Sequence, residues 1–281
     1  MFRGLYTATS GMMANNRKQQ ILTNNLANMN TPGFKQDQSV SRAFPEQLIK
    51  ALNVNKTVLN RNGVKDSIGT LNTGVYVQEG VPSFLQGALK ETGKNTDLAL
   101  IDEYLPINPE NGQRGSLVFA VRLENGELRY TRNGQFSIGQ DGLLKTSDGY
   151  NVLNENLQPI QITSDQFTVS DRGQITLNDG TLSDQIWIGY TEKPHQFVKE
   201  GNSLLRWDGP GNEAPVNILG IDALIGTSVV QQGFIEQSNV DLTKTMTEMI
   251  STYRSFESNQ KVIQAYDRSM EIAANDIGKI Y

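Results

Sequence analysis

Residue types that commonly build catalytic and metal sites are scarce in this chain of 281 residues. It contains no cysteine and a single histidine, His195. Without thiols there can be no disulfide framework, no thiolate metal site and no cysteine nucleophile, and one imidazole cannot form a histidine-based metal centre. The sequence therefore predicts a protein that is stabilised by packing and carries no cofactor and no metal.

Enzyme motifs are missing as well. The chain has no HExxH, no nucleophile elbow and no phosphate-binding glycine loop. Asp97, Asp102 and Glu103 form the one acidic cluster in an apolar setting, and we interpret it as a solvated loop. Because the two acids of a glycosidase need no fixed spacing in sequence, a cell-surface or peptidoglycan-binding or hydrolysing module with a helical stalk stays as the alternative hypothesis.

Long apolar runs and early acidic residues are also absent. No segment approaches the 18 apolar residues of a membrane span, and no apolar run of signal-peptide length follows the first charges. Residues 1–36 carry Arg3, Arg17, Lys18 and Lys35 but no acid. An organelle transit peptide is disfavoured, because only two of these charges are arginine and no cleavage pattern follows. The net charge of -5 argues against nucleic-acid binding.

Both ends of the chain show a heptad pattern, in which residues of one face recur at steps of three and four. The first seam contains Leu5, Ala8, Met12, Asn15, Gln19, Leu22, Leu26 and Met29. The second contains Leu242, Met246, Met249, Tyr253, Phe256, Gln260, Ile263, Asp267, Met270, Ala274, Ile277 and Tyr281. We expect two terminal helices that pack as a coiled coil, with apolar residues off the seams left over for a further partner, namely Ile21, Ile250, Val262, Tyr266 and Ile272.

The stretch "NNLANMNTPGFK" is unusual for a helix. Asn24, Asn25 and Asn28 together oppose helix formation by about 2 kcal/mol. After them, the segment 31–34 has Pro and Gly at the central positions of a type II turn. Since an amide side chain both donates and accepts hydrogen bonds, these asparagines suit a crowded interface between helices.

The middle of the chain, residues 84–224, is predicted to be one β-rich domain. Apolar runs such as "LVFAVRL", "LRYTR", "QFSI", "LLKT" and "YNVL" alternate with Asn-Gly and Asp-Gly pairs at 125–126, 133–134, 141–142 and 148–149. This spacing is typical of successive hairpins or tight strand connections. We expect a compact sandwich or irregular barrel. Between the first helix and this domain, "RAFPEQLIKAL" could form a short helix, and the remainder of 36–83 is polar and predicted to be extended.

Three segments carry a resemblance to the bacterial flagellar hook-basal body (rod) protein family. The first is "SGMMANNRKQQILTNNLANMNTPGFK", and the second is the C-terminal block that begins "GFIEQSNVDLTKTM". The third, "GALKETGKNTDLALI" with "YTRNGQFSIGQDGLLKTSDGYNVL", is similar to the central block of FlgF/FlgG-like rod proteins. The usual Gly-Phe-Phe strand is replaced by "IDEYLPINPENGQRGSLVFAV". Because of this departure, the chain resembles divergent rod paralogues of the FlhO/FlhP type more than FlgF or FlgG.

The resemblance implies an α+β protein in which terminal N- and C-helices form an α-helical coiled-coil domain and the centre is all β. The implied division is 1–35 with 240–281 as the helical rod core, 36–83 with 225–239 as an extended packing region, and 84–224 as the β-rich domain. It implies a structural, self-assembling rod component that transmits motor torque to the hook, and not an enzyme.

The same resemblance implies particular partners and a location. The partners would be other copies of the chain, other rod and hook proteins and the flagellar type III export apparatus, with peptidoglycan or ring proteins around the rod as further candidates. The location would be the extracytoplasmic basal body, reached without a cleavable signal peptide. The expected subunit interface contains Leu22, Asn24, Asn25, Leu26, Asn28, Thr31, Gly33, Phe34, Met246, Met249, Tyr253, Phe256, Ile263 and Met270.

Overall fold

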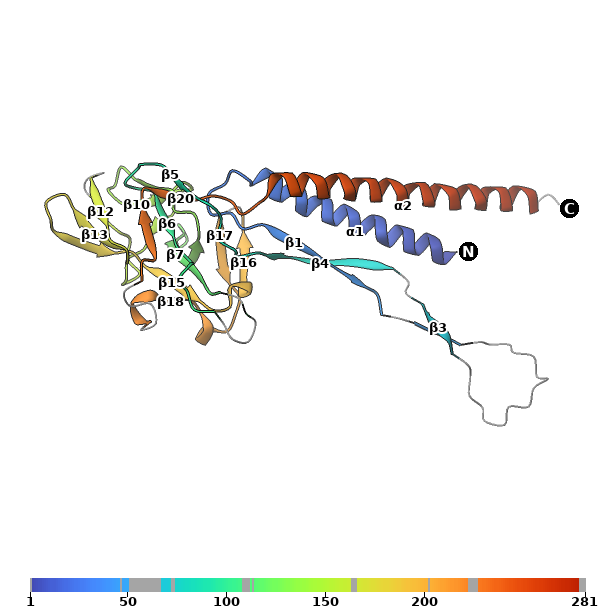
Figure 1. The fold of residues 1–281 in the computed structure, drawn as a ribbon, viewed down its shortest axis with the longest axis horizontal. Coiled ribbons are helices and arrows are strands. Elements are labelled where there is room, and N and C mark those ends of the chain that lie inside the picture. Colours follow the sequence, from blue (N-terminus) through green and yellow to red (C-terminus); the bar gives the residue numbers. More distant parts are fainter. Residues whose placement is uncertain are drawn as a thin grey trace, which may run out of the picture. The chain divides into compact units, whose positions relative to one another are not determined.

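The protein has an α+β architecture, with one long helix near each end of the chain and a mostly β region between them (Figure 1). The computed structural model describes residues 2–45, 47–50, 67–71, 74–107, 112, 114–162, 166–201, 203–221 and 227–277. The chain divides into two compact units. Unit 1 comprises Met1–Asn24, Asp37–Val81 and Thr243–Tyr281, and unit 2 comprises Asn25–Gln36 and Pro82–Leu242.

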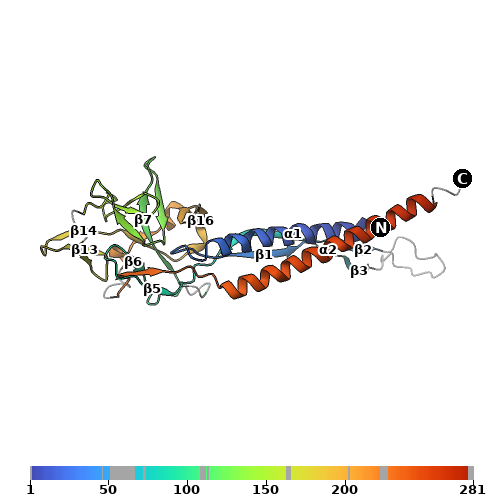
Figure 2. The same ribbon diagram turned by 90° about the horizontal axis from the view of Figure 1, so that it is seen from above.

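Two helices dominate unit 1. They are α1, Phe2–Ala27, and α2, Leu242–Ile277. Three contacts show that they run antiparallel: Gly4 lies against the Tyr266 ring, Gly11 lies against the Asn259 amide, and Lys18 Nζ lies 3.6 Å from Glu248 Oε2. In Figure 2, α2 runs obliquely to α1 and overlaps it near the N-terminus. All eight residues of the first predicted seam are buried or half-buried, seven of them on α1 and Met29 just after its end.

The predicted seam on α2 is wrong by one residue at every second position. The stripe that contains the α1 contacts consists of Thr245, Met249, Thr252, Phe256, Asn259, Ile263, Tyr266, Met270 and Ala273, all buried or half-buried. The predicted members Leu242, Met246, Tyr253, Gln260, Asp267 and Ala274 are exposed instead, while the side chains of Ile277 and Tyr281 lie outside the described residues. Small residues on α1 let the helices approach closely, and this closeness favours narrow side chains over bulky ones. Thr252 also satisfies its hydroxyl within the helix, because Oγ1 donates to Glu248 O at 2.7 Å.

Extended segments complete the described part of unit 1. Strand β1 (Asp37–Ala43) pairs with β4 (Val75–Pro82), and β2 (Gln47–Lys50) pairs antiparallel with β3 (Ser67–Leu71). The short helix that we expected within "RAFPEQLIKAL" is therefore wrong at Gln47–Lys50. Pro45 explains part of this difference, since a residue that precedes proline is driven towards extended conformations.

Unit 2 is built on a nine-stranded antiparallel sheet that branches at β7. Its strands are β7 (Ser116–Arg122), β8 (Leu128–Thr131), β9 (Phe136–Ile138), β10 (Leu144–Thr146), β11 (Asn151–Val152), β15 (Ile188–Thr191), β16 (Phe197–Glu200), β17 (Leu204–Trp207) and β18 (Val216–Asn217). Short 3-10 helices follow at Pro194–Gln196, Gly211–Glu213 and Ile218–Gly220. The five strands predicted between residues 117 and 153 are confirmed.

Smaller sheets complete the described part of unit 2. They are formed by β12 (Phe167–Val169), β13 (Gln174–Leu177) and β14 (Leu182–Gln185), by β6 (Leu98–Leu100) with β19 (Val230–Gln232), and by β5 (Leu89–Glu91) with β20 (Phe234–Glu236). One buried apolar cluster takes residues from the nine-stranded sheet and from β6, β12, β13 and β19. Strands β19 and β20 therefore belong to unit 2, where they pair with β6 and β5 from a much earlier part of the chain.

Turn glycines in unit 2 mostly match the prediction. Gly126, Gly142 and Gly149 all have positive φ angles, between 73° and 88°. Gly134 is different, because its φ is not positive and a side chain there would collide with the carbonyl oxygen of Leu98. Leu98 N donates to Gly134 O at 3.0 Å, so this glycine allows two backbones to approach rather than making a hairpin turn.

Candidate functional site

Four buried charged residues meet inside unit 2 from distant parts of the sequence. We refer to Lys35, Asp102, Arg132 and Glu236 as the charge cluster; each is at most 6% exposed. Lys35 Nζ lies 2.7 Å from Glu236 Oε1. Arg132 connects the two acids, because its Nε lies 2.5 Å from Glu236 Oε2 and its Nη2 lies 2.7 Å from Asp102 Oδ2. Two positive and two negative side chains therefore form one neutral group.

Further hydrogen bonds, mostly to backbone groups, hold the charge cluster in place. Lys35 Nζ donates to Leu85 O at 2.9 Å, and Glu236 Oε1 accepts from Gly87 N at 2.8 Å. Arg132 Nη1 donates to Asp102 Oδ1 at 2.9 Å and to Leu117 O at 2.6 Å. Because buried charges are costly unless they are paired and hydrogen-bonded, these contacts are the condition for placing four charges in a β core.

Burial and pairing act in opposite directions on the pKa values of the charge cluster. Burial tends to raise the pKa of Glu236, but the charges of Arg132 and Lys35 outweigh it and hold that pKa below its ordinary value. Burial, together with the neighbouring charge of Arg132, lowers the pKa of Lys35, and Glu236 offsets this only in part. Burial also tends to lower the pKa of Arg132, but Asp102 and Glu236 raise it above its ordinary value. Glu236 is therefore ionised at neutral pH and depends on its cationic partners.

The expectation of a solvated acidic loop at residues 97–103 is wrong for two of its three members. Asp97 and Asp102 are buried, whereas Glu103 is exposed. Asp102 is held in place by the two-pronged contact with Arg132, and its Oδ1 also accepts from Leu117 N at 3.3 Å. An apolar neighbourhood in the sequence signalled burial here, but the partner lies 30 residues away in the chain and was not apparent.

The segment 31–36 enters the β unit through the predicted type II turn. Phe34 N donates to Thr31 O at 3.3 Å and Gly33 has a φ of 69°, as this turn requires at its third position. Gly33 also packs directly against the main chain of Arg132, and its N–H donates to Glu236 O at 2.8 Å. Phe34 is buried beneath Lys199, whose Nζ lies 4.3 Å from the centre of the ring. The turn therefore delivers Lys35 to the charge cluster.

Asn239 secures the same segment from the C-terminal side. Its Oδ1 accepts from Gln36 N at 2.7 Å, and its Nδ2 donates to Ser83 O at 2.8 Å and to Leu85 O at 3.0 Å. Asn239 therefore connects the segment that precedes α2 to Gln36 and to residues 83–85 within unit 2. Asp241 directly precedes α2.

The residues predicted for the subunit interface have different surroundings in the single chain. Leu22, Asn25, Asn28, Gly33 and Phe34 are buried; Leu26, Thr31, Met249, Phe256, Ile263 and Met270 are half-buried; Asn24, Met246 and Tyr253 are exposed. Asn28 Oδ1 accepts from Thr31 Oγ1 at 3.3 Å. Thr31, Gly33 and Phe34 are brought together in the turn, while the α2 residues divide between an inner and an outer face. Their role in contacts between subunits stays a prediction.

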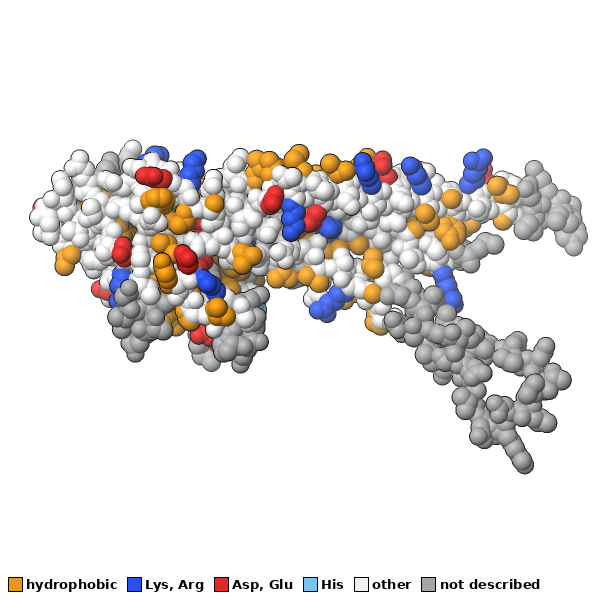
Figure 3. Space-filling view, viewed as in Figure 1, with side chains coloured by type: hydrophobic (Ala, Val, Ile, Leu, Met, Phe, Trp, Pro, Cys, Tyr) orange, Lys and Arg blue, Asp and Glu red, His pale blue; other side chains and the backbone are white. Residues whose placement is uncertain are grey.

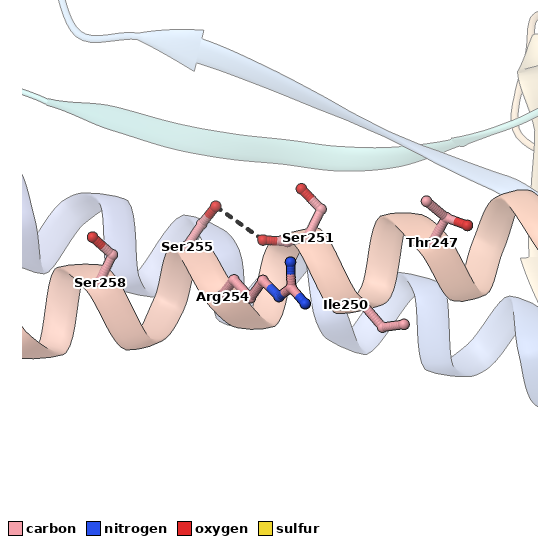
Figure 4. A pocket seen from close by; sticks show the side chains of 6 residues that line it. All are labelled: Thr247, Ile250, Ser251, Arg254, Ser255 and Ser258. Atoms are coloured by element: carbon pink, nitrogen blue, oxygen red, sulfur yellow. Dashed lines mark hydrogen bonds between the residues drawn. The ribbon is translucent and has the colours of Figure 1, made fainter.

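The outer face of α2 carries apolar side chains near the start of the helix. Met246, Ile250 and Tyr253 lie on one side of the helix and are 49%, 55% and 54% exposed. Figure 3 shows apolar side chains gathered along this part of α2. Beside this outer stripe, a shallow depression is lined by Thr247, Ile250, Ser251, Arg254, Ser255 and Ser258 (Figure 4). Ser255 Oγ donates to Ser251 O at 3.0 Å, so this hydroxyl is satisfied within the helix.

Among the described residues, no group of three or more His, Asp or Glu side chains could hold a metal ion. Within the same part of the chain, no helix is long and apolar enough to cross a membrane. His195 lies in the short 3-10 helix Pro194–Gln196. The charge cluster has the geometry of a structural network, because its four charged side chains form ion pairs with one another.

Three family models match the chain in separate segments. Residues 5–35 match the flagella basal body rod protein model, residues 114–177 the flagellar hook protein FlgE/F/G D1 domain, and residues 231–276 the flagellar basal body rod FlgEFG protein C-terminal model. Whole-chain relatives agree: the flagellar hook-basal body complex protein FlhO of Bacillus subtilis (strain 168) is 42% identical over 280 residues, covering 100% of both chains. The chain belongs to the flagellar basal body rod protein family.

Other rod proteins are similar over nearly the whole length. The flagellar basal-body rod protein FlgG of Bacillus subtilis (strain 168) is 32% identical and covers 98% of this chain and 99% of its own. FlgG of Borreliella burgdorferi is 30% identical, with 98% of each chain covered. The protein is thus a structural component of the flagellar rod and not an enzyme, and the hypothesis of a wall-hydrolysing module is set aside.

The charge cluster lies where the family-matched segments meet. Lys35 belongs to the N-terminal match, Arg132 to the central match and Glu236 to the C-terminal match. The sequence did not predict their meeting, although Lys35 ends the N-terminal signature and Glu236 belongs to the C-terminal block. The three family-matched segments are therefore connected inside unit 2 by one ionic network.

Proposed function

We propose that this rod protein assembles with copies of itself by helical head-to-tail packing and forms part of the shaft that transmits motor torque to the hook. Heterologous contacts that do not close generate such an open array. Other rod and hook proteins would be its neighbours along the shaft. The names of its relatives, which belong to the basal body and the hook-basal body complex, support this proposal.

The observation that carries the proposal is the outer stripe of α2, formed by Met246, Ile250 and Tyr253. These side chains remain about half-exposed even though α2 already contacts α1 on its other face. Clustered exposed apolar residues on a soluble protein commonly mark a surface that another molecule covers. A second copy of the chain is the occupant that a self-assembling shaft supplies.

In the assembled shaft, we propose that the terminal helices form a coiled-coil layer. The rod core would comprise 1–35 with 240–281, the packing region 36–83 with 225–239, and the β-rich domain 84–224. The three-and-four spacing of the buried residues on both helices supports the coiled coil.

The route to this position would be export by the flagellar type III apparatus, without a cleavable signal peptide, to the extracytoplasmic part of the basal body in the cell envelope. The absence of cysteine supports an exported chain that needs no redox control of its folding. Peptidoglycan and ring proteins around the rod are further proposed neighbours.

The proposal is tested by making the outer stripe polar. In the double variant Ile250→Ser and Tyr253→Ser, we expect unchanged stability of unit 2 and retained helix content in the purified chain, but few complete basal bodies by electron microscopy and strongly reduced swimming. The matched control is Leu182→Ser, which removes a 74% exposed apolar side chain from unit 2. Normal basal bodies and swimming in the stripe variant would count against assembly through this face.

A further inference from the structure

Both ends of the β unit are held by residues that lie about two hundred positions apart in the chain. Gly33 N donates to Glu236 O, Gln36 N donates to Asn239 Oδ1, and Lys35 Nζ contacts Glu236 Oε1. The C-terminal segment is in turn connected to the interior of unit 2. Val230 N donates to Asp171 O at 3.1 Å, and Gly233 N donates to Asp97 O at 2.8 Å.

Electroneutrality of the interior depends on all four members of the charge cluster. Without Glu236, Lys35 and Arg132 would share the single carboxylate of Asp102. Without Lys35, Asp102 and Glu236 would share the single cation of Arg132. Either state leaves an uncompensated charge at positions that are at most 6% exposed, and breaking a buried ion pair in this way is strongly destabilising.

The geometry points to the charge cluster as a closing latch of unit 2: we propose that the β unit completes its fold only when Lys35 and Glu236 are both docked. Segments 31–36 and 229–239 then open only together with the β core, as one cooperative unit, and do not fray as independent ends. Arg132 is the residue that links the two docking events, because it contacts Glu236 through Nε and Asp102 through its two terminal nitrogens.

This latch has a consequence for an exported chain, which rests on the proposed export. Whichever end leaves the exporter first, the whole stretch from Lys35 to Glu236 must have emerged before the cluster can become neutral. A partly exported chain therefore lacks a stable β unit, and folding follows the release of almost the entire chain. The cooperative behaviour itself does not depend on export and can be measured on the purified protein.

The test is native-state hydrogen exchange on the full chain. In the unaltered protein, the amides of Gly33 and Gly87, which bond to Glu236, should open with the same free energy as core amides such as Leu153 and Ile160. Exchange of the Gly33 and Gly87 amides more than tenfold faster than that of the core would overturn the latch, because the ends would then undock by themselves.

Charge variants sharpen the result. In Glu236→Gln, hydrogen exchange should become more than about 100-fold faster at the amides of Gly33 and Gly87. The core amides of Leu153 and Ile160 should be accelerated by a similar factor. Adding Lys35→Met removes the surplus cation and should recover a part of this loss. If Glu236→Gln does not fold at all, folding of the double variant Lys35→Met with Glu236→Gln supports the latch. If Glu236→Gln folds and only its end amides exchange faster, the latch is refuted.

The matched control is Glu213→Gln, which breaks the partly exposed pair with Lys193. Surface pairs contribute little, so exchange in the core should change by less than about tenfold. Because these measurements use the purified chain, they are independent of the assembly defect expected for the outer-stripe variant, and either result can fail without the other.

Discussion

Gly33→Ala should destabilise unit 2 much more than an alanine at another turn glycine. Gly33 has a φ of 69°, and a Cβ added there would lie 2.5 Å from the carbonyl carbon of Arg132 and 2.6 Å from Asn133 N. The left-handed conformation costs a non-glycine residue roughly 1–2 kcal/mol. Relief of the collision requires a shift of the main chain that carries Arg132, and overpacking of this kind costs about 1–3 kcal/mol more. The expected loss is therefore about 2–5 kcal/mol.

Gly126→Ala is the matched control for the Gly33 substitution. Gly126 has a φ of 84°, but no atom lies within 4 Å of an added Cβ. Its substitution should cost only the conformational part, about 1–2 kcal/mol. Urea unfolding followed by tryptophan fluorescence measures both variants, because Trp187 and Trp207 lie in unit 2.

The difference in stability loss between Gly33→Ala and Gly126→Ala isolates the effect of the collision with Arg132. Equal losses at both positions would show that the close approach of segment 31–36 to Arg132 contributes nothing to the stability of unit 2. A larger loss at Gly33 should also appear as a lower midpoint in urea, with an unchanged dependence on denaturant.

Three further predictions concern the surroundings of the same network. The pKa of Glu236 is lowered in the folded chain, so the ionised carboxylate contributes to stability above its ordinary pKa of 4.5, and this contribution is lost as the pH falls. Urea midpoints should therefore decline below that pH, and rising midpoints would contradict this. Asn239→Ala removes three hydrogen bonds and should cost about 2–4 kcal/mol in urea unfolding, whereas Asn125→Ala at an exposed turn should cost less than about 1 kcal/mol. Lys199→Met removes the cation above Phe34 and should cost about 1 kcal/mol; an unchanged melting temperature would show that this contact is not stabilising.

Periodic and turn signals in the sequence were sufficient to predict much of the fold. Strands between Asp-Gly and Asn-Gly pairs, two terminal helices and the type II turn at 31–34 follow from local preferences that the tertiary structure does not override. Gly134 shows the limit of such signals, because an Asn-Gly pair also occurs where a second backbone needs room.

The features that the sequence predicted wrongly or did not predict depend on packing between distant segments. The α2 seam was assigned to Met246 and Tyr253 because they are large and apolar, yet Thr245 and Thr252 are the buried residues. The charge cluster could not be predicted, since Lys35 and Glu236 are 201 positions apart and nothing local in either segment indicates a buried partner. Burial of Asp102 likewise depends on Arg132, from a different strand end.

The composition of the α2 stripe that contains the α1 contacts affects how strongly α1 and α2 bind each other. Thr245, Thr252 and Asn259 occupy alternate positions of this stripe, so only about half of its layers bury a large apolar side chain. We therefore expect this helix pair to be held less firmly than one with a continuous apolar seam. In the assembly proposed above, the contact between α1 and α2 should then adjust to neighbouring subunits while the β core of unit 2 stays folded.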